Sequence, residues 1–312
     1  MKNKMAVKIG EHLKKKPVRQ VEITATDDGH CLRFDAMASP CEVLVASKDN
    51  KLALTLGKLI ADEVWRIEDK YSRYQATSVC SAINNSGGQA LAIDQETYLL
   101  LNFADTCYKL SEGVFDITSG VLRQVWQFDG SDNIPHDRDV QKSLENIGWH
   151  KIFFDEQQII MPEHMEIDFG GIGKEYAVDR AMIIANEFTQ LPLLVNLGGD
   201  LAANKPRKTN VPWQVGIEHP GFIERKPMVV SLLKGALATS GDAKRFLFKD
   251  NVRYSHILNA KTGWPVVQAP RSITVVAPQC IQAGILATLA LMQGPQAEGF
   301  LTEQEIKFWA IR

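Results

Sequence analysis

Apolar residues recur along the chain at two spacings, one typical of amphipathic helices and one typical of short strands. The longest helix is predicted over residues 52–71, where apolar side chains stand at positions 52, 56, 59, 60, 64 and 67. A second helix is predicted over 96–110, with Asp94 as its N-cap. Two more are predicted over 171–188, which begins in glycine, and over 281–292, which is strongly apolar.

Strands are predicted where short runs of β-branched, aromatic and other apolar residues are bounded by turn residues. These runs are 21–25, 31–35, 42–47, 151–154, 158–161, 193–197, 212–218, 228–233, 236–240, 253–258 and 272–276. The first two flank Asp27-Asp28-Gly29 and are predicted to form a hairpin. Residues 122–136 are rich in turn formers, and no helix or strand is predicted there. Helices and strands alternate irregularly without a run of βαβ units, so the order favours an α+β fold with antiparallel sheets over a doubly wound parallel sheet.

Composition places the chain among ordinary globular proteins. It has 312 residues, of which 45% are hydrophobic and 23% charged, enough to bury a large core without disulfides or structural metal. No stretch rich in Gly, Ser and Pro divides it, so residues 21–312 are predicted to form a single domain. The longest strongly apolar run, 283–292, is too short to cross a bilayer, and no membrane span is expected.

Charge and cysteines narrow the function classes. The net charge of −2 argues against a protein that binds nucleic acid by neutralising phosphates. Residues 1–20 carry seven Lys or Arg against Glu11 alone and lack the apolar stretch of a secretory signal, so they are predicted to be a basic, flexible tail. The five cysteines are odd in number and include no CxxC, which predicts neither a disulfide framework nor a zinc site. A reducing cytoplasm is the expected location.

The segment DFGGIGKEYAVD, residues 168–179, runs from a predicted strand end through glycines into a helix. Glycines let a backbone approach a ligand closely, and a helix N-terminus favours phosphate. Lys174 adds a cation in the first turn, although neither a Walker A loop nor GxGxxG is present. On these residues alone, a structural turn and a phosphate site both remain open. The same choice applies to VNLGGD, residues 195–200, where a flat ligand could lie against paired glycines.

Hydroxyl residues, a carboxylate and a histidine lie close in sequence in ALATSGD, residues 236–242, and RYSHILNAKTG, residues 253–263. A Ser-His-Asp hydrolase is poorly supported, because no GxSxG elbow occurs. On these residues alone, both a catalytic role and a structural role for His256 remain open. In SEGVFDITSG, residues 111–120, the phenylalanine could anchor the loop and the aspartate could cap the next helix.

Taken together and in this order, the segments resemble the ApbE-type FAD:protein FMN transferases. MASPCEVLV is similar to the family's first ligand loop, usually Met-Gly-Thr, and IEDKYSRYQATSVCSAINN to its helix end. SEGVFDITSGVL is similar to the family's Gly-Ala-Phe-Asp-Pro-Thr segment. DFGGIGKEYAVD, VNLGGD, ALATSGD and RYSHILNAKTG complete the set. The resemblance runs from about Leu32 to Gly294.

The resemblance implies a T-fold-like α+β arrangement and an enzyme that binds FAD and Mg²⁺. Such enzymes move FMN onto a Thr, or sometimes Ser, hydroxyl of a target flavoprotein, leaving a phosphoester link and releasing AMP. The implied partner is therefore an acceptor flavoprotein. Two other functions stay open: a non-catalytic FAD-binding relative, and an FAD pyrophosphatase that uses water and gives FMN and AMP.

The resemblance also implies roles for individual residues. His256 matches the family's catalytic-site histidine. The positions that match flavin-nucleotide contacts are Met37, Tyr74, Val114, Phe115, Asp116, Asp168, Lys174 and Ile257. Gly171, Gly284 and Thr288 match the metal positions. Two small departures from the family pattern are Ala38 in place of Gly and Asn259 in place of Asp.

A larger departure concerns the metal. The family's usual ending is Ala-Asp-Ala-Leu-Ser-Thr, in which Asp and Thr bind Mg²⁺, and here residues 283–288 read AGILAT. Thr288 is kept, but Gly284 supplies no side-chain oxygen, whereas Mg²⁺ sites normally use one or two carboxylates. No carboxylate close in sequence replaces it, and Asp242 is a candidate from elsewhere. Gly284→Asp is expected to be tolerated, because replacing glycine in a helix usually stabilises the helix, and to tighten metal binding, because it adds a charged ligand.

Overall fold

The structure is a computed structural model that describes residues 19–217, 228–242 and 245–312. The predicted basic tail lies outside these residues apart from Arg19 and Gln20, and so does the last residue of the strand predicted over 212–218. The Arg19 guanidinium donates two hydrogen bonds, of 2.7 and 2.6 Å, to the Asp69 carboxylate on the first helix. The chain is therefore tied to the domain from Arg19 onwards.

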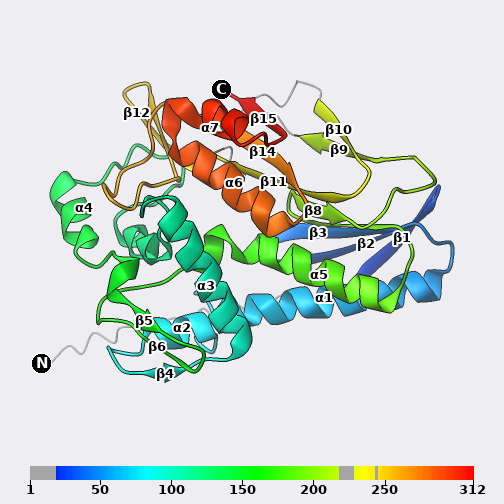
Figure 1. The fold of residues 1–312 in the computed structure, drawn as a ribbon, viewed down its shortest axis with the longest axis horizontal. Helices are drawn as coiled ribbons and strands as arrows, with labels where there is room; N and C mark the ends of the chain where they lie inside the picture. Colours follow the sequence, from blue (N-terminus) through cyan, green and yellow to red (C-terminus); the bar gives the residue numbers. More distant parts are fainter. Residues whose placement is uncertain (1–18, 218–227, 243–244) are drawn as a thin grey trace, which may run out of the picture.

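An eight-stranded antiparallel sheet forms the centre of the molecule (Figure 1). Its order is β1-β2-β3-β7-β8-β11-β14-β15, and every neighbouring pair is antiparallel. The strands are β1 (Glu22–Thr26), β2 (Gly29–Ala36), β3 (Ser39–Val45), β7 (Leu193–Leu197), β8 (Asp200–Ala203), β11 (Gly235–Gly241), β14 (Ser272–Ala277) and β15 (Phe308–Ile311). Together with the helices below, this sheet confirms the predicted α+β class.

Three long helices cover one face of this sheet: α1 (Asn50–Tyr71), α5 (Gly173–Phe188) and α6 (Cys280–Met292). All three begin and end within two residues of the predicted helices. Their apolar faces and the inward side chains of the sheet form the main core. Asp49 starts α1 by accepting a hydrogen bond of 3.0 Å from the Leu52 amide, which is the usual N-cap arrangement.

A β-ribbon made of β9 (Trp213–Ile217) and β10 (Met228–Leu232) covers the opposite face. Leu194 and Leu201 of the sheet pack there against Trp213 and Val230. Since successive side chains of a strand point to opposite faces, β7 sends Val195 to the main core and Leu194 to this second core. The short, mostly apolar strand predicted over 193–197 is thus explained by burial on both faces.

Most of the remaining elements lie on the left of Figure 1. The last helix, α7, lies near the C-terminus. The remaining elements are α2 (Val79–Asn84), β4 (Leu91–Ala92), α3 (Gln95–Leu110), η1 (Ile117–Gln124), α4 (Asp137–Leu144), η2 (Trp149–Lys151), β5 (Phe153–Phe154), β6 (Gln158–Ile160), η3 (Phe169–Gly171), β12 (Phe246–Lys249), β13 (Val252–Ser255), η4 (Gly294–Gln296) and α7 (Ala297–Glu303). A third core surrounds Trp126 and joins η1, α4 and β12. Among the described residues, no helix is long and apolar enough to span a membrane.

Candidate functional site

Strand order gathers several of the predicted ligand segments at one end of the sheet. The β2–β3 turn and the β7–β8 turn lie side by side, since the Gly198 amide donates to the Pro40 carbonyl at 3.1 Å. The end of β11 reaches the same region, because Leu237 pairs with Leu201 and the strand continues past β8. Segments that are distant in sequence therefore share one edge.

The first of these segments is a two-residue turn. Met37 and Ala38 have φ of 51° and 56°, the left-handed values that a tight hairpin turn of this kind requires. The Met37 amide donates a hydrogen bond of 2.7 Å to the Glu68 carboxylate on α1, which fixes the turn to the helix layer. Ala38 adopts a conformation that glycine adopts without strain.

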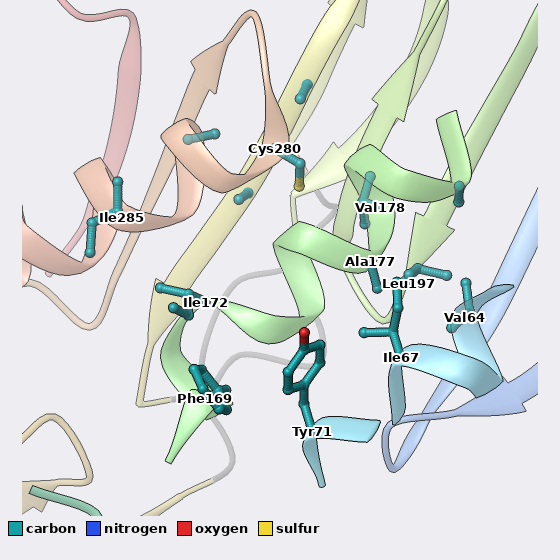
Figure 2. Close-up of a cluster of buried hydrophobic side chains, with 14 of the residues drawn as sticks. Val64, Ile67, Tyr71, Phe169, Ile172, Ala177, Val178, Leu197, Cys280 and Ile285 are labelled. Atoms are coloured by element: carbon teal, nitrogen blue, oxygen red, sulfur yellow. The ribbon is translucent and has the colours of Figure 1, made fainter. Parts of the chain in front are cut away.

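The junction from η3 into α5 rests on a closely packed base. Phe169 is buried and packs edge-to-face on Tyr71, with ring centroids 5.1 Å apart (Figure 2). Asp168 caps η3 by accepting the Gly170 amide at 2.9 Å. Gly170 and Gly171 are exposed, and a Cβ on Gly171 would lie 3.3 Å from the Phe115 ring. Exposed glycine backbone above a fixed core, leading into a helix of 16 residues, is a suitable place for a phosphate.

Lys174, in the first turn of α5, joins this junction to the β7–β8 turn. Its Nζ atom lies 3.7 Å from Asp200 Oδ2 and would lie 3.6 Å from a Cβ on Gly198. Gly198 has φ of +65°, and its added Cβ would also lie 2.5 Å from the Ser39 side chain. Glycine is thus required here both by the turn and by the close approach of β3. Lys174 lies where a cation can face an anionic ligand at the sheet edge.

Tyr74 stands at the rim of the same region. It is 81% exposed, yet it is held in place because the Arg73 guanidinium lies 4.8 Å from the ring centroid and donates to the phenol oxygen at 2.7 Å. Arg73 also forms an ion pair of 3.1 Å with Asp168. A large exposed aromatic ring that is positioned by a neighbouring cation is suited to stack on a flat ligand.

The segment 114–116 connects the glycine junction to the histidine segment. The Val114 carbonyl accepts the Ala260 amide at 3.2 Å, and the Ile117 carbonyl accepts the Asp168 amide at 2.9 Å. The buried Asp116 carboxylate accepts three hydrogen bonds within the protein, from the Thr118 amide and hydroxyl and from the Trp149 amide. In this structure Asp116 therefore caps η1, as its local sequence indicated.

His256 follows β13 directly. Its Nδ1 atom lies 3.1 Å from the Arg245 carbonyl oxygen, so in the neutral ring the proton resides on Nδ1 and Nε2 is left as the basic nitrogen. Burial of the ring lowers its pKa below 6.5, which keeps it neutral at physiological pH. The next residue, Ile257, packs against the main core and so holds the backbone on this side. The arrangement is that of a histidine prepared to accept a proton.

Two of the three predicted metal positions, Gly284 and Thr288, lie on α6, and Gly171 lies at the end of η3. Gly284 is buried within the helix, and Thr288 one turn later donates a hydrogen bond of 3.1 Å to the Ser240 hydroxyl at the end of β11. Asp242, proposed from the sequence as a replacement carboxylate, is occupied by two arginines: its oxygens accept from Arg253 and Arg271 at 2.7 and 2.9 Å. Asp242 is therefore a poor source of a metal ligand.

Sequence reasoning missed Glu175, which faces Gly284 from α5. A Cβ on Gly284 would lie 2.6 Å from both Cγ and Oε1 of Glu175. Gly284→Asp alone would thus require the Glu175 side chain to move, a contact that helix propensity does not take into account. The Glu175 Oε2 atom is shielded from solvent and has no hydrogen-bond partner. Desolvation, and then the charge of Asp200, raise the pKa of Glu175 to about 8.

Within the described residues, no group of three or more His, Cys, Asp or Glu side chains gathers as a transition-metal site would require. Magnesium needs less, since one or two carboxylates with hydroxyl, carbonyl and phosphate oxygens are sufficient. The donors present here are of that kind: a solvent-shielded carboxylate oxygen without a partner, the Thr288 hydroxyl and exposed glycine backbone. This donor set fits a hard divalent cation.

Comparisons with known proteins agree with the geometry. The model of the ApbE family matches residues 37–309. A protein named FAD:protein FMN transferase from Vibrio cholerae is 26% identical over 291 residues, which cover 90% of this chain and 84% of that protein. One of the same name from Chlamydia pneumoniae is 28% identical over 276 residues, covering 86% and 83%. The crystal structure of the ApbE protein from Thermotoga maritima superposes with a TM-score of 0.80 at 28% identity, covering 93% and 94%.

Proposed function

Because the chain belongs to the ApbE family, we propose that it is an FAD:protein FMN transferase. In this proposal it moves FMN from FAD onto a Thr or Ser hydroxyl of an acceptor flavoprotein, with Mg²⁺ as cofactor and AMP as the leaving product. The observation that carries the proposal is the meeting, at one end of the sheet, of the exposed glycines before α5, Lys174 and the β7–β8 turn.

The pyrophosphate of FAD is assigned to the N-terminus of α5. Free backbone N–H groups and the helix dipole favour negative charge there, and Lys174 supplies a formal cation. Tyr74 is assigned to a flavin or adenine ring, because its exposed face is positioned by Arg73. Met37 and Phe115 supply apolar contact from the two neighbouring segments. Each assignment uses a residue whose place is fixed by contacts within the protein.

The group transfer balances with His256 as the base. The acceptor hydroxyl oxygen forms a bond to the phosphorus of the FMN half, and the bond from that phosphorus to the AMP oxygen breaks. AMP leaves with the electron pair, and the hydroxyl proton passes to Nε2 of His256. The hydrogen bond from Nδ1 to the Arg245 carbonyl stabilises the ring in the tautomer that this step needs.

A bound divalent cation would neutralise the charge that develops on the pyrophosphate oxygens. The Thr288 hydroxyl and the Gly171 backbone carbonyl are the residues of this chain assigned to hold it. A cytoplasmic location belongs to the same proposal and is supported by five buried cysteines without disulfides, as expected in a reducing compartment.

Incubation with FAD, Mg²⁺ and a purified acceptor domain, followed by intact mass spectrometry, tests the proposal. An added FMN phosphoryl mass on the acceptor, lost when the target Thr is changed to Ala, is the expected result. Free FMN and AMP without acceptor modification would instead identify a pyrophosphatase. Bound FAD with neither product would identify a non-catalytic relative, and absence of FAD binding would refute the whole assignment.

A further inference from the structure

The contact between α5 and α6 is the feature that the family resemblance leaves unexplained. The two helices run antiparallel, because Asp179 caps α6 by accepting the amides of Cys280 and Ile281 at 2.8 and 2.9 Å. One turn earlier on α5, Glu175 meets Gly284, which stands one turn later on α6. The two residues are therefore partners across one interhelical contact.

Gly284 is the residue that makes room for Glu175. Any side chain at position 284 would begin with a Cβ 2.6 Å from Cγ and Oε1 of Glu175 and 2.9 Å from Cδ. The Glu175 carboxyl group thus occupies the volume into which a side chain at 284 would extend. A carboxylate from α5 stands where the family places one from α6.

The charges around Glu175 make this placement informative. Asp179 is satisfied by two backbone amides, and Asp200 by Lys174 and the Thr239 amide. By contrast, Glu175 Oε2 is shielded from solvent and has no partner. Buried polar atoms in folded proteins nearly always have a partner, so an unpaired carboxylate oxygen beside a ligand region is a candidate cation ligand.

We propose that Glu175 supplies the carboxylate ligand of the divalent cation that position 284 cannot supply. In this proposal the carboxylate ligand comes from α5 and not from α6, and Gly284 leaves the space that the Glu175 side chain occupies. This inference rests on the proposed function, since the cation is the one that serves the FAD reaction. The competing explanation is a protonated, purely structural carboxyl group that fills space next to a glycine.

Glu175→Gln separates the two explanations, because it keeps the shape of the side chain and removes the charge. The measurement is the affinity for Mn²⁺ by electron paramagnetic resonance, and for Mg²⁺ by calorimetry, without FAD and with it. Loss of an outer-shell partner typically costs a metal site 10–100-fold, so loss of a direct ligand should weaken binding by at least about tenfold. Glu187→Gln, an exposed carboxylate on the same helix, is the matched control and should bind as the parent does.

A reciprocal exchange provides the second test. Glu175→Gly with Gly284→Asp should restore metal affinity to within a few-fold of the parent, since the carboxylate returns to α6 and the space is vacated on α5. Gly284→Asp alone should lower the melting temperature, because both carboxyl groups compete for one volume. The double variant keeps the inference testable even if one single variant folds poorly.

Equal Mn²⁺ affinity in the parent and Glu175→Gln, with both proteins folded, would overturn the inference. The proposed function would still hold after that result if flavin fluorescence is still quenched on FAD binding and FMN is still transferred. Conversely, a parent that binds Mn²⁺ through Glu175 but shows no quenching of flavin fluorescence would refute the proposed function and support the ligand assignment. The two failures are therefore distinguishable.

Discussion

A suitable replacement of His256 removes the proton acceptor and keeps the hydrogen bond to the Arg245 carbonyl. His256→Asn is the informative change, because its side-chain amide can donate to the Arg245 carbonyl as Nδ1 of His256 does at 3.1 Å. It lacks any group that could act as the basic Nε2. His256→Ala removes both functions, so the pair of variants separates proton transfer from positioning.

A general base typically contributes about 10²–10⁴-fold, equivalent to about 2.7–5.4 kcal/mol of transition-state stabilisation. Both variants should therefore transfer FMN at least about 100-fold more slowly while binding FAD as the parent does. Intact mass of an acceptor domain, sampled over time, measures the rate, and flavin fluorescence measures binding. Transfer by His256→Asn at the parental rate would show that Nε2 is not the base.

The pH dependence follows from the environment of the ring. Desolvation lowers the pKa of His256 below 6.5, and the Arg245 cation acts in the same direction, whereas the hydrogen bond to the Arg245 carbonyl and the charge of Asp242 act against it. Transfer by the parent should fall only as the pH drops below 6.5 through this lowered pKa. The unfolded chain takes up the proton first, so the contribution of His256 to stability is present above pH 6.5 and is lost as the pH falls through the folded pKa. An unchanged acid limb in His256→Asn would contradict this assignment.

Substitutions at three further residues test other parts of the candidate site. Tyr74→Ala should weaken FAD binding by about 1–3 kcal/mol without changing the melting temperature, and Tyr74→Phe should not, because stacking needs only the ring. Asp242→Asn should destabilise the fold by about 3–5 kcal/mol in urea denaturation, since two arginines lose their counter-charge, and should leave Mn²⁺ affinity unchanged. A loss of Mn²⁺ affinity in a folded Asp242→Asn protein would make Asp242 a ligand after all. Phe169→Ala should cost about 3–5 kcal/mol of unfolding free energy, and a change below about 1 kcal/mol would show that the glycine junction does not depend on this ring.

The pattern of apolar residues was sufficient for the elements that bury a whole face. The helix predicted over 52–71 is confirmed as α1, and the helix predicted over 281–292 as α6, because their apolar residues meet the sheet. Among the described residues, seven short α-helices and strands were not predicted. They are α2, α4, α7, β4, β8, β12 and β15. β8 is typical, since DLAA after two glycines has no strong strand preference and becomes a strand only through its neighbours β7 and β11.

The candidate site was predictable as a set of segments and not as an arrangement. Ser39 and Gly198 are neighbours because β3 pairs with β7, and no local pattern reports which strands pair. Asp116 shows the opposite case. Its local sequence indicated a helix cap, and its three hydrogen bonds within the protein bear out that local reading. Local interactions such as helix caps could be predicted from the sequence, whereas contacts between distant residues depend on the topology of the sheet.

The glycine at position 284 is interpreted differently from the sequence and from the structure. Read along α6, the glycine removes a carboxylate and replaces it with nothing. Across the helix contact, the same glycine is the one residue that lets the Glu175 carboxyl group fill the vacated volume. Cation binding depends on where the ligand oxygen lies and not on which helix carries it. Either position 175 or position 284 can therefore supply the carboxylate ligand, provided that only one of them is acidic. Positions 175 and 284 should therefore vary together among related chains, with a small residue on one helix wherever an acid stands on the other.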